Sequence, residues 1–158
     1  MCQLVDTKQL SQYSFDWRQL QGCWRMTSMR LGDELVPSQI VGNSTVVVDG
    51  DVWELEFRNR FTAYDFRLDP SRNHLDLISD VGGIRKVIRC LYEWDGDRLV
   101  ICRPFRNTSR RPERIESAEG VGVSVWERQP ETKPITRPVE AIQYDSVNNS
   151  QSEVASPA

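Results

Sequence analysis

The stretch LYEWDGDRLVIC, residues 91–102, predicts a β-hairpin and with it the fold class of the chain. Apolar and polar residues alternate on both sides of an Asp-Gly pair, which favours the positive φ angles of a two-residue turn. With residues 95 and 96 as the loop, Tyr92 faces Leu99, so apolar side chains share one face of the hairpin.

The same turn signal recurs in VVVDGDVWEL, residues 46–55. A further hairpin follows it directly, and we expect Asn59 and Arg60 to form its loop. In that register Trp53 faces Phe66, which again gathers apolar side chains on one face.

Short alternating runs of this kind recur along most of the chain with turn residues between them, the pattern of an all-β fold. Eight candidate strands follow: 23–31, 44–49, 52–58, 61–68, 74–79, 87–94, 98–103 and 121–128. Joined mostly by tight hairpins, they predict an antiparallel up-and-down barrel of the lipocalin-like kind, since closure removes exposed strand edges. In the last strand we expect Val121, Val123 and Val125 to face the interior.

The ends of the chain differ from this central region in composition. We expect an N-terminal extension over residues 1–18, a barrel domain over 19–128 and a disordered polar tail over 129–158. A short helical turn over residues 12–21 would plug one end of the barrel. The tail has too few apolar residues to bury a core of its own.

Composition excludes several classes of protein. The chain has 158 residues, a net charge of −3 and no long apolar run, which argues against a membrane span and against general nucleic-acid binding. The first residues lack the apolar core of a signal peptide, so we expect a cytoplasmic protein. With one histidine and scattered cysteines (Cys2, Cys23, Cys90 and Cys102), we expect no metal site, no cofactor and no disulfide between Cys90 and Cys102.

Large rings crowd the predicted interior and form a candidate ligand site. Its residues are Trp53, Tyr64, Phe66, Tyr92 and Trp94. Rings of this size could simply fill a small barrel, or the tyrosine hydroxyls could face a pocket as the polar groups of a ligand site.

A second candidate site is the loop RPFRNTSRRPER, residues 103–114, which is strongly basic within an acidic chain. It contains Arg103, Arg106, Arg110, Arg111 and Arg114 against a single glutamate. The loop could recognise an anion or an acidic partner. Alternatively, its charges could be solvated and paired with Glu116 and Glu119.

Several motifs in order along the chain resemble an uncharacterised lipocalin-like domain family abundant in planctomycetes. They are LQGCWRMTSMRLGDELVP (20–37), FRLDPSRNHLDLI (66–78), LYEWDGDRLVIC (91–102) and RRPERIES (110–117), and the resemblance spans about residues 19–128. It implies a bacterial protein with a calycin-type β-barrel and carries no activity. It also implies that Gly22 and Trp24 begin the first strand at the closed end of the barrel, with Arg128 packed across the Trp24 ring.

These observations predict a non-enzymatic binding module, for a small apolar ligand in the barrel or for a protein partner at its mouth. We assign no catalytic residue. The alternative is an enzyme that uses the barrel mouth, with Arg103, a tyrosine (Tyr64 or Tyr92) and a carboxylate as its components.

Overall fold

A computed structural model of the chain describes residues 7–130, with side chains from residue 12 onward. The predicted disordered tail lies outside these residues apart from its first two positions, 129 and 130. The predicted boundary between extension and barrel, at residue 18, falls inside a helix that ends at Leu20.

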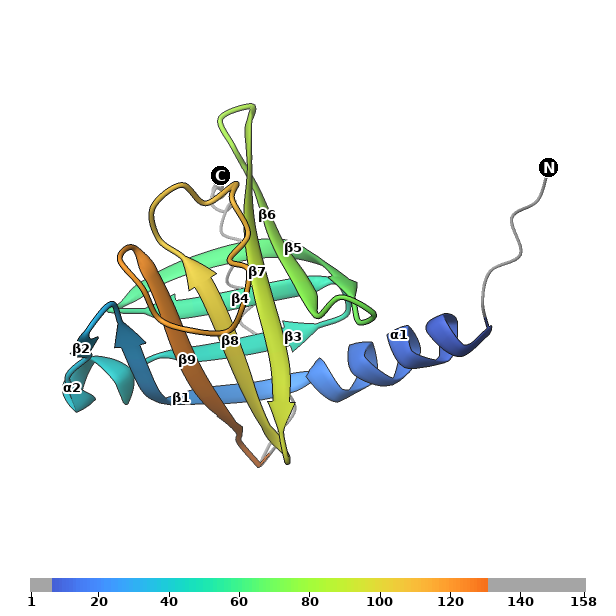
Figure 1. Cartoon of the computed structure of the whole chain (residues 1–158), viewed down its shortest axis with the longest axis horizontal. Coiled ribbons are helices and arrows are strands. Elements are labelled where there is room, and N and C mark those ends of the chain that lie inside the picture. Colours follow the sequence, from blue (N-terminus) through green and yellow to red (C-terminus); the bar gives the residue numbers. More distant parts are fainter. Residues whose placement is uncertain (1–6, 131–158) are drawn as a thin grey trace, which may run out of the picture.

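Eight antiparallel strands close into a barrel in up-and-down order, as the sequence predicted (Figure 1). They are β1 (Gly22–Leu31), β3 (Thr45–Asp49), β4 (Val52–Phe57), β5 (Arg60–Asp69), β6 (His74–Val81), β7 (Ile84–Asp95), β8 (Arg98–Pro104) and β9 (Val121–Arg128). Each strand pairs with its neighbour along the barrel, and β1 also pairs with β9 to complete the ring. A bulge between Met26 and Ser28 interrupts that last pairing.

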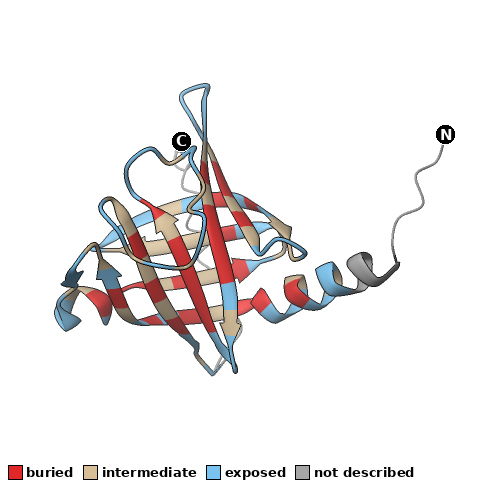
Figure 2. Ribbon diagram, in the orientation of Figure 1, coloured by how far each residue is buried: buried red, intermediate tan, exposed pale blue. Residues whose placement is uncertain are grey.

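The two ends of the barrel are named here by their connections. The floor carries the tight turns β3–β4, β5–β6 and β7–β8, and the mouth carries the turns β4–β5 and β6–β7, the long β8–β9 loop and the β1–β3 segment. Buried residues alternate with more exposed ones along several strands, whereas β8 buries four residues in a row, Leu99 to Cys102 (Figure 2).

The hairpin registers differ from the predicted ones by two residues. In the β7–β8 hairpin, Tyr92 pairs with Ile101 rather than with Leu99, and the loop consists of Gly96 and Asp97. Gly96 has φ 65° and is the first loop residue, the position at which a type II′ turn prefers glycine. A shift of two residues preserves the faces, because side chains alternate with a period of two.

The β4–β5 hairpin shows the same shift. Trp53 pairs with Tyr64 rather than with Phe66, and Arg58 and Asn59 form the loop in place of the predicted residues 59 and 60. Their φ angles of 54° and 64° are both positive, as a type I′ turn requires.

Three further elements flank the barrel: α1 (Thr7–Leu20), β2 (Glu34–Leu35) and α2 (Ser38–Val41). The sequence predicted a shorter helical turn in place of α1 and neither β2 nor α2. Figure 1 shows α1 reaching the floor with its C-terminal end while the rest projects away from the barrel. Neither helix in the described part of the chain is long and apolar enough to cross a membrane.

Candidate functional site: the mouth cavity of the barrel

The floor of the barrel is filled by aromatic rings. Trp24 is 1% exposed, and its ring lies 6.0 Å from that of Trp94, which in turn lies 6.4 Å from that of Tyr92. The Trp24 Nε1 donates a hydrogen bond of 2.8 Å to the Leu20 carbonyl at the end of α1. Three aromatic rings therefore pack against one another at this end of the barrel.

An arginine fastens the floor from outside. The guanidinium carbon of Arg128 lies 4.4 Å from the ring centroid of Trp24, a cation–π contact. Arg128 also donates to the carbonyls of Gln21, at 2.6 Å, and of Gln19. Gly22 has φ 120°, which permits the sharp entry from α1 into β1.

A buried hydrogen bond joins α1 to the floor. The Tyr92 hydroxyl donates to Asp16 Oδ2 at 2.5 Å, and Gln12 Nε2 donates to the other carboxylate oxygen at 2.9 Å. Burial, followed by the bond to Asp16, raises the pKa of Tyr92 above its ordinary value. Asp16 itself is only 4% exposed, so this contact holds the last turns of α1 against the barrel.

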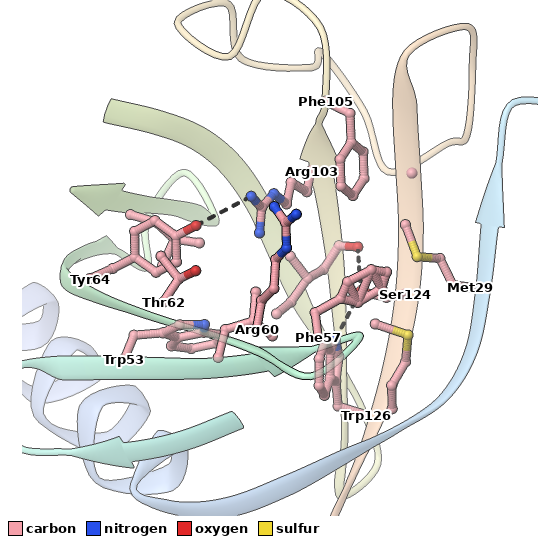
Figure 3. A pocket seen from close by; sticks show the side chains of 15 residues that line it. Met29, Trp53, Phe57, Arg60, Thr62, Tyr64, Arg103, Phe105, Ser124 and Trp126 are labelled. Atoms are coloured by element: carbon pink, nitrogen blue, oxygen red, sulfur yellow. Dashed lines mark hydrogen bonds between the residues drawn. The ribbon is translucent and has the colours of Figure 1, made fainter. Parts of the chain in front are cut away.

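The mouth half of the interior holds a cavity of about 200 Å³ (Figure 3). Its walls are mostly apolar and come from six strands and the start of the β8–β9 loop. The lining residues are Met26, Met29, Trp53, Leu55, Phe57, Arg60, Thr62, Tyr64, Leu77, Ile101, Arg103, Phe105, Gly122, Ser124 and Trp126.

Two arginines supply the charge of this cavity. Figure 3 shows Arg60 from β5 and Arg103 from β8 pointing into the same part of it. The guanidinium carbon of Arg103 lies 5.9 Å from the Tyr64 ring centroid and 5.1 Å from that of Phe105, and its Nη2 is 3.5 Å from the Tyr64 hydroxyl. Among the described residues, the buried Nε of Arg103 has no hydrogen-bond acceptor.

The five rings that the sequence singled out occupy two levels of the barrel. Trp53 and Tyr64 line the cavity. Phe66 packs edge-on against Trp53 at 6.0 Å, and Tyr92 and Trp94 belong to the floor. Of the two alternatives considered from the sequence, the filled core therefore describes the floor half of the interior, and the pocket describes the mouth half.

The inner face of β9 was predicted wrongly. Gly122, Ser124 and Trp126 line the cavity, while the valines at 121, 123 and 125 are half-buried on the other face. A Cβ atom on Gly122 would lie 2.9 Å from the ends of the Met29 and Phe105 side chains. Glycine at this position therefore lets these two side chains of the cavity wall pack against β9. The valines were predicted to face inward because they are apolar, whereas the wall of this cavity also contains small and polar residues.

Four of the five arginines of the loop (Arg106, Arg110, Arg111 and Arg114) line one surface groove together with three glutamates, and Arg103 lies apart from them. Arg103 points into the cavity, whereas Arg111 donates to the Cys90 carbonyl at 2.7 Å and pairs with Asp76 at 2.7 Å. Arg106 pairs with Glu119 at 2.8 Å and Arg114 with Glu116 at 2.6 Å, which are the two partners considered from the sequence. Arg110 is exposed.

The buried cysteines are poorly suited to nucleophilic chemistry. Cys90 and Cys102 are free and buried, and burial raises the pKa of Cys90 to about 12 and also raises that of Cys102. Both thiols are therefore protonated near neutral pH, whereas the thiolate is the reactive form.

Sequence reasoning missed Arg60, Thr62 and Trp126 as cavity residues. Arg60 was assigned to a loop, although it is the first residue of β5 and faces inward beside Thr62 and Tyr64 at a period of two. That alternation was the available signal, but the loop was predicted one residue too late and so took in Arg60.

Comparisons of the chain with protein-family models, curated proteins and solved structures found no match.

Proposed function

We propose that the protein is a non-enzymatic binding module that holds a small, largely apolar ligand in the mouth cavity. The observation that carries this proposal is the cavity itself, which has mostly apolar walls and lies above a ring-filled floor. An enclosed apolar space of about 150 Å³ is enough to bind a single aromatic ring in other proteins. At about 200 Å³, this cavity has room for a ligand of that order.

The chemistry of the walls favours binding over catalysis. Among the described residues that line the cavity, none carries a carboxylate, an imidazole or a thiol. The enzyme considered from the sequence needs a carboxylate beside Arg103 and Tyr64, and the described cavity wall offers none for general acid–base catalysis. The buried carboxylate of Asp16 instead accepts a hydrogen bond from Tyr92 at the floor.

We also propose that the chain belongs to the lipocalin-like family that its motifs resemble. The order of those motifs supports this, as does the stacking of Arg128 on Trp24 beside the positive φ of Gly22. Membership would imply a calycin-type barrel, but it would specify neither an activity nor a ligand.

The test of binding is titration with 1-octanol, an uncharged apolar probe, followed by tryptophan fluorescence, because Trp53 and Trp126 line the cavity. We expect saturable binding that Thr62→Phe abolishes by filling the cavity. The matched control is Ala63→Phe, which adds the same ring on the exposed face of β5. Binding that persists unchanged in Thr62→Phe would place the probe elsewhere and refute the proposal. Native mass spectrometry of the purified protein would reveal any ligand carried from the cell.

A further inference from the structure

The charged side chains of the cavity indicate the class of ligand more closely than the cavity volume does. Arg103 is half-buried, and its contacts in the structure are two aromatic rings and one long contact to a hydroxyl. Among the described residues, neither Arg103 nor Arg60 forms an ion pair with a carboxylate. A buried cation without an anion is unfavourable, because it loses hydration and gains no partner.

The other arginines of the β8–β9 loop behave differently. Arg106, Arg111 and Arg114 each pair with a carboxylate at 2.6–2.8 Å. Acidic partners are therefore available around this loop, yet none reaches into the cavity. Arg103 stands apart because its Nε is buried and has no acceptor among the described residues, while its side chain lines the cavity.

Arg60 adds a second positive charge to the same space. It is exposed and begins β5, and it points into the part of the cavity that Arg103 also enters from β8 (Figure 3). Two guanidinium groups that face one cavity repel one another, whereas an anion between them is attracted to both.

The two charged groups of the cavity both lie toward its mouth, where Phe57 and Phe105 also line it. Arg60 adjoins the β4–β5 turn and Arg103 is next to the last residue of β8, so both lie near the mouth. Trp53 is the second residue of β4, and Trp126 pairs with Leu99 near the start of β8, so these rings lie deeper, toward the floor. A ligand that matches this arrangement has its apolar body inward and its anionic group at the mouth.

We propose that the ligand of the mouth cavity is an amphipathic monocarboxylate, held with its apolar body against the deep rings and its carboxylate between Arg60 and Arg103. This inference rests on the proposed binding function and specifies its ligand class. A carboxylate suits the site because its two oxygens match the forked donors of a guanidinium group. The hydroxyls of Thr62 and Tyr64, which line the same wall, add further donors.

The experiment compares probes of one chain length that differ in the head group. Octanoate, 1-octanol and octylammonium are each titrated into the full-length protein by isothermal calorimetry. We expect octanoate to bind at least about tenfold more tightly than 1-octanol, and octylammonium to bind least, because a third cation would enter beside two arginines.

Variants then test which groups hold the carboxylate. Arg103→Met keeps an unbranched side chain and removes its charge, and we expect octanoate affinity to fall about 10- to 100-fold. Arg60→Met should reduce it about two- to fivefold, because exposed charges interact more weakly. Arg110→Met, an exposed arginine in the same loop, is the control and should bind all three probes as the wild type does.

The outcomes separate the two proposals. If 1-octanol and octanoate bind equally and Thr62→Phe abolishes both, the binding function stands and the carboxylate inference is overturned. If no probe binds, both are overturned. An equal loss of octanoate affinity in Arg110→Met and Arg103→Met would also overturn the inference, because the effect would then reflect general positive charge. Since Arg60 is exposed, its variant keeps the test decisive even if Arg103→Met fails to fold.

Discussion

The floor and the mouth of this barrel each place an arginine against aromatic rings, but the two arginines differ in what else they contact. At the floor, Arg128 stacks on Trp24 and donates to two backbone carbonyls. At the mouth, Arg103 lies near Tyr64 and Phe105, and its buried Nε has no acceptor among the described residues. The floor arginine is satisfied by the protein, whereas the mouth arginine has hydrogen-bonding capacity left over.

This difference separates stability from recognition within one small barrel. A closed set of contacts lowers the free energy of the folded state but leaves nothing for a ligand to add. Unsatisfied groups in a cavity do the reverse, because their cost falls only when a partner binds. We therefore expect floor substitutions to change the free energy of unfolding and mouth substitutions to change affinity.

The largest effect should come from Trp24→Ala. Removal of this buried ring leaves a cavity in the floor and unseats Arg128, so the free energy of unfolding should fall by about 3–5 kcal/mol. Urea denaturation measures this, with Phe61→Ala as the control because Phe61 is 70% exposed. A change below about 1 kcal/mol would mean that the floor is not the stable half of the barrel.

A smaller effect is expected at Arg111, whose side chain anchors the β8–β9 loop to two neighbouring strands. Arg111→Met removes the bonds to the Cys90 carbonyl and to Asp76, and it should lower the free energy of unfolding by about 1.5–3 kcal/mol. Arg110→Met in the same loop should change it by less than about 0.5 kcal/mol. Equal effects of the two variants in thermal melts would argue against the pairing of Arg111.

The free energy of unfolding should fall gradually as the pH becomes alkaline. The folded pKa values of Tyr92 and Cys90 are raised by burial above 10.0 and 9.0, so the unfolded chain loses these protons first as pH rises. Stability should be complete below about pH 9 and then fall by up to about 1.4 kcal/mol per pH unit for each group. Urea titrations from pH 8 to 11 check this. The fall should be shallower in Tyr92→Phe, and an identical slope in that variant would exclude Tyr92 as a cause.

The smallest effect on stability is expected for Arg103→Met. Because this substitution removes a partly buried and unpaired charge, the free energy of unfolding should stay within about 1 kcal/mol of the wild-type value or rise. Urea denaturation without added ligand gives the answer. A loss comparable to that of Trp24→Ala would show that Arg103 holds the mouth together rather than serving a ligand.

The fold could be predicted from the sequence because the alternation in stretches such as 91–102 reports strands and their faces directly. The registers could not, since Asp-Gly-Asp does not specify whether glycine takes the first or the second loop position. The candidate site was found in part. Trp53 and Tyr64 follow from alternation, but their depth relative to Tyr92 depends on how the strands tilt and close.

The roles of the individual arginines could not be predicted from the sequence, for a different reason. Five arginines in residues 103–114 look alike along the chain, and their partners include Asp76 and the Cys90 carbonyl on other strands. Only the folded barrel separates Arg103, which faces the cavity, from Arg111, which anchors the loop. Arg60 became visible as a partner of Arg103 for the same reason.

The contacts that Arg128 makes at the floor have a consequence for how the chain folds. Its bond to the Gln21 carbonyl joins residues 107 positions apart, and β9 pairs with β1 over a similar separation. The hairpins between them connect near neighbours and can form early, whereas ring closure must await the last strand and overcome the entropy of a long loop. Closure is therefore expected to limit the folding rate, and until it occurs the free edges of β1 and β9 are exposed to pairing with other chains.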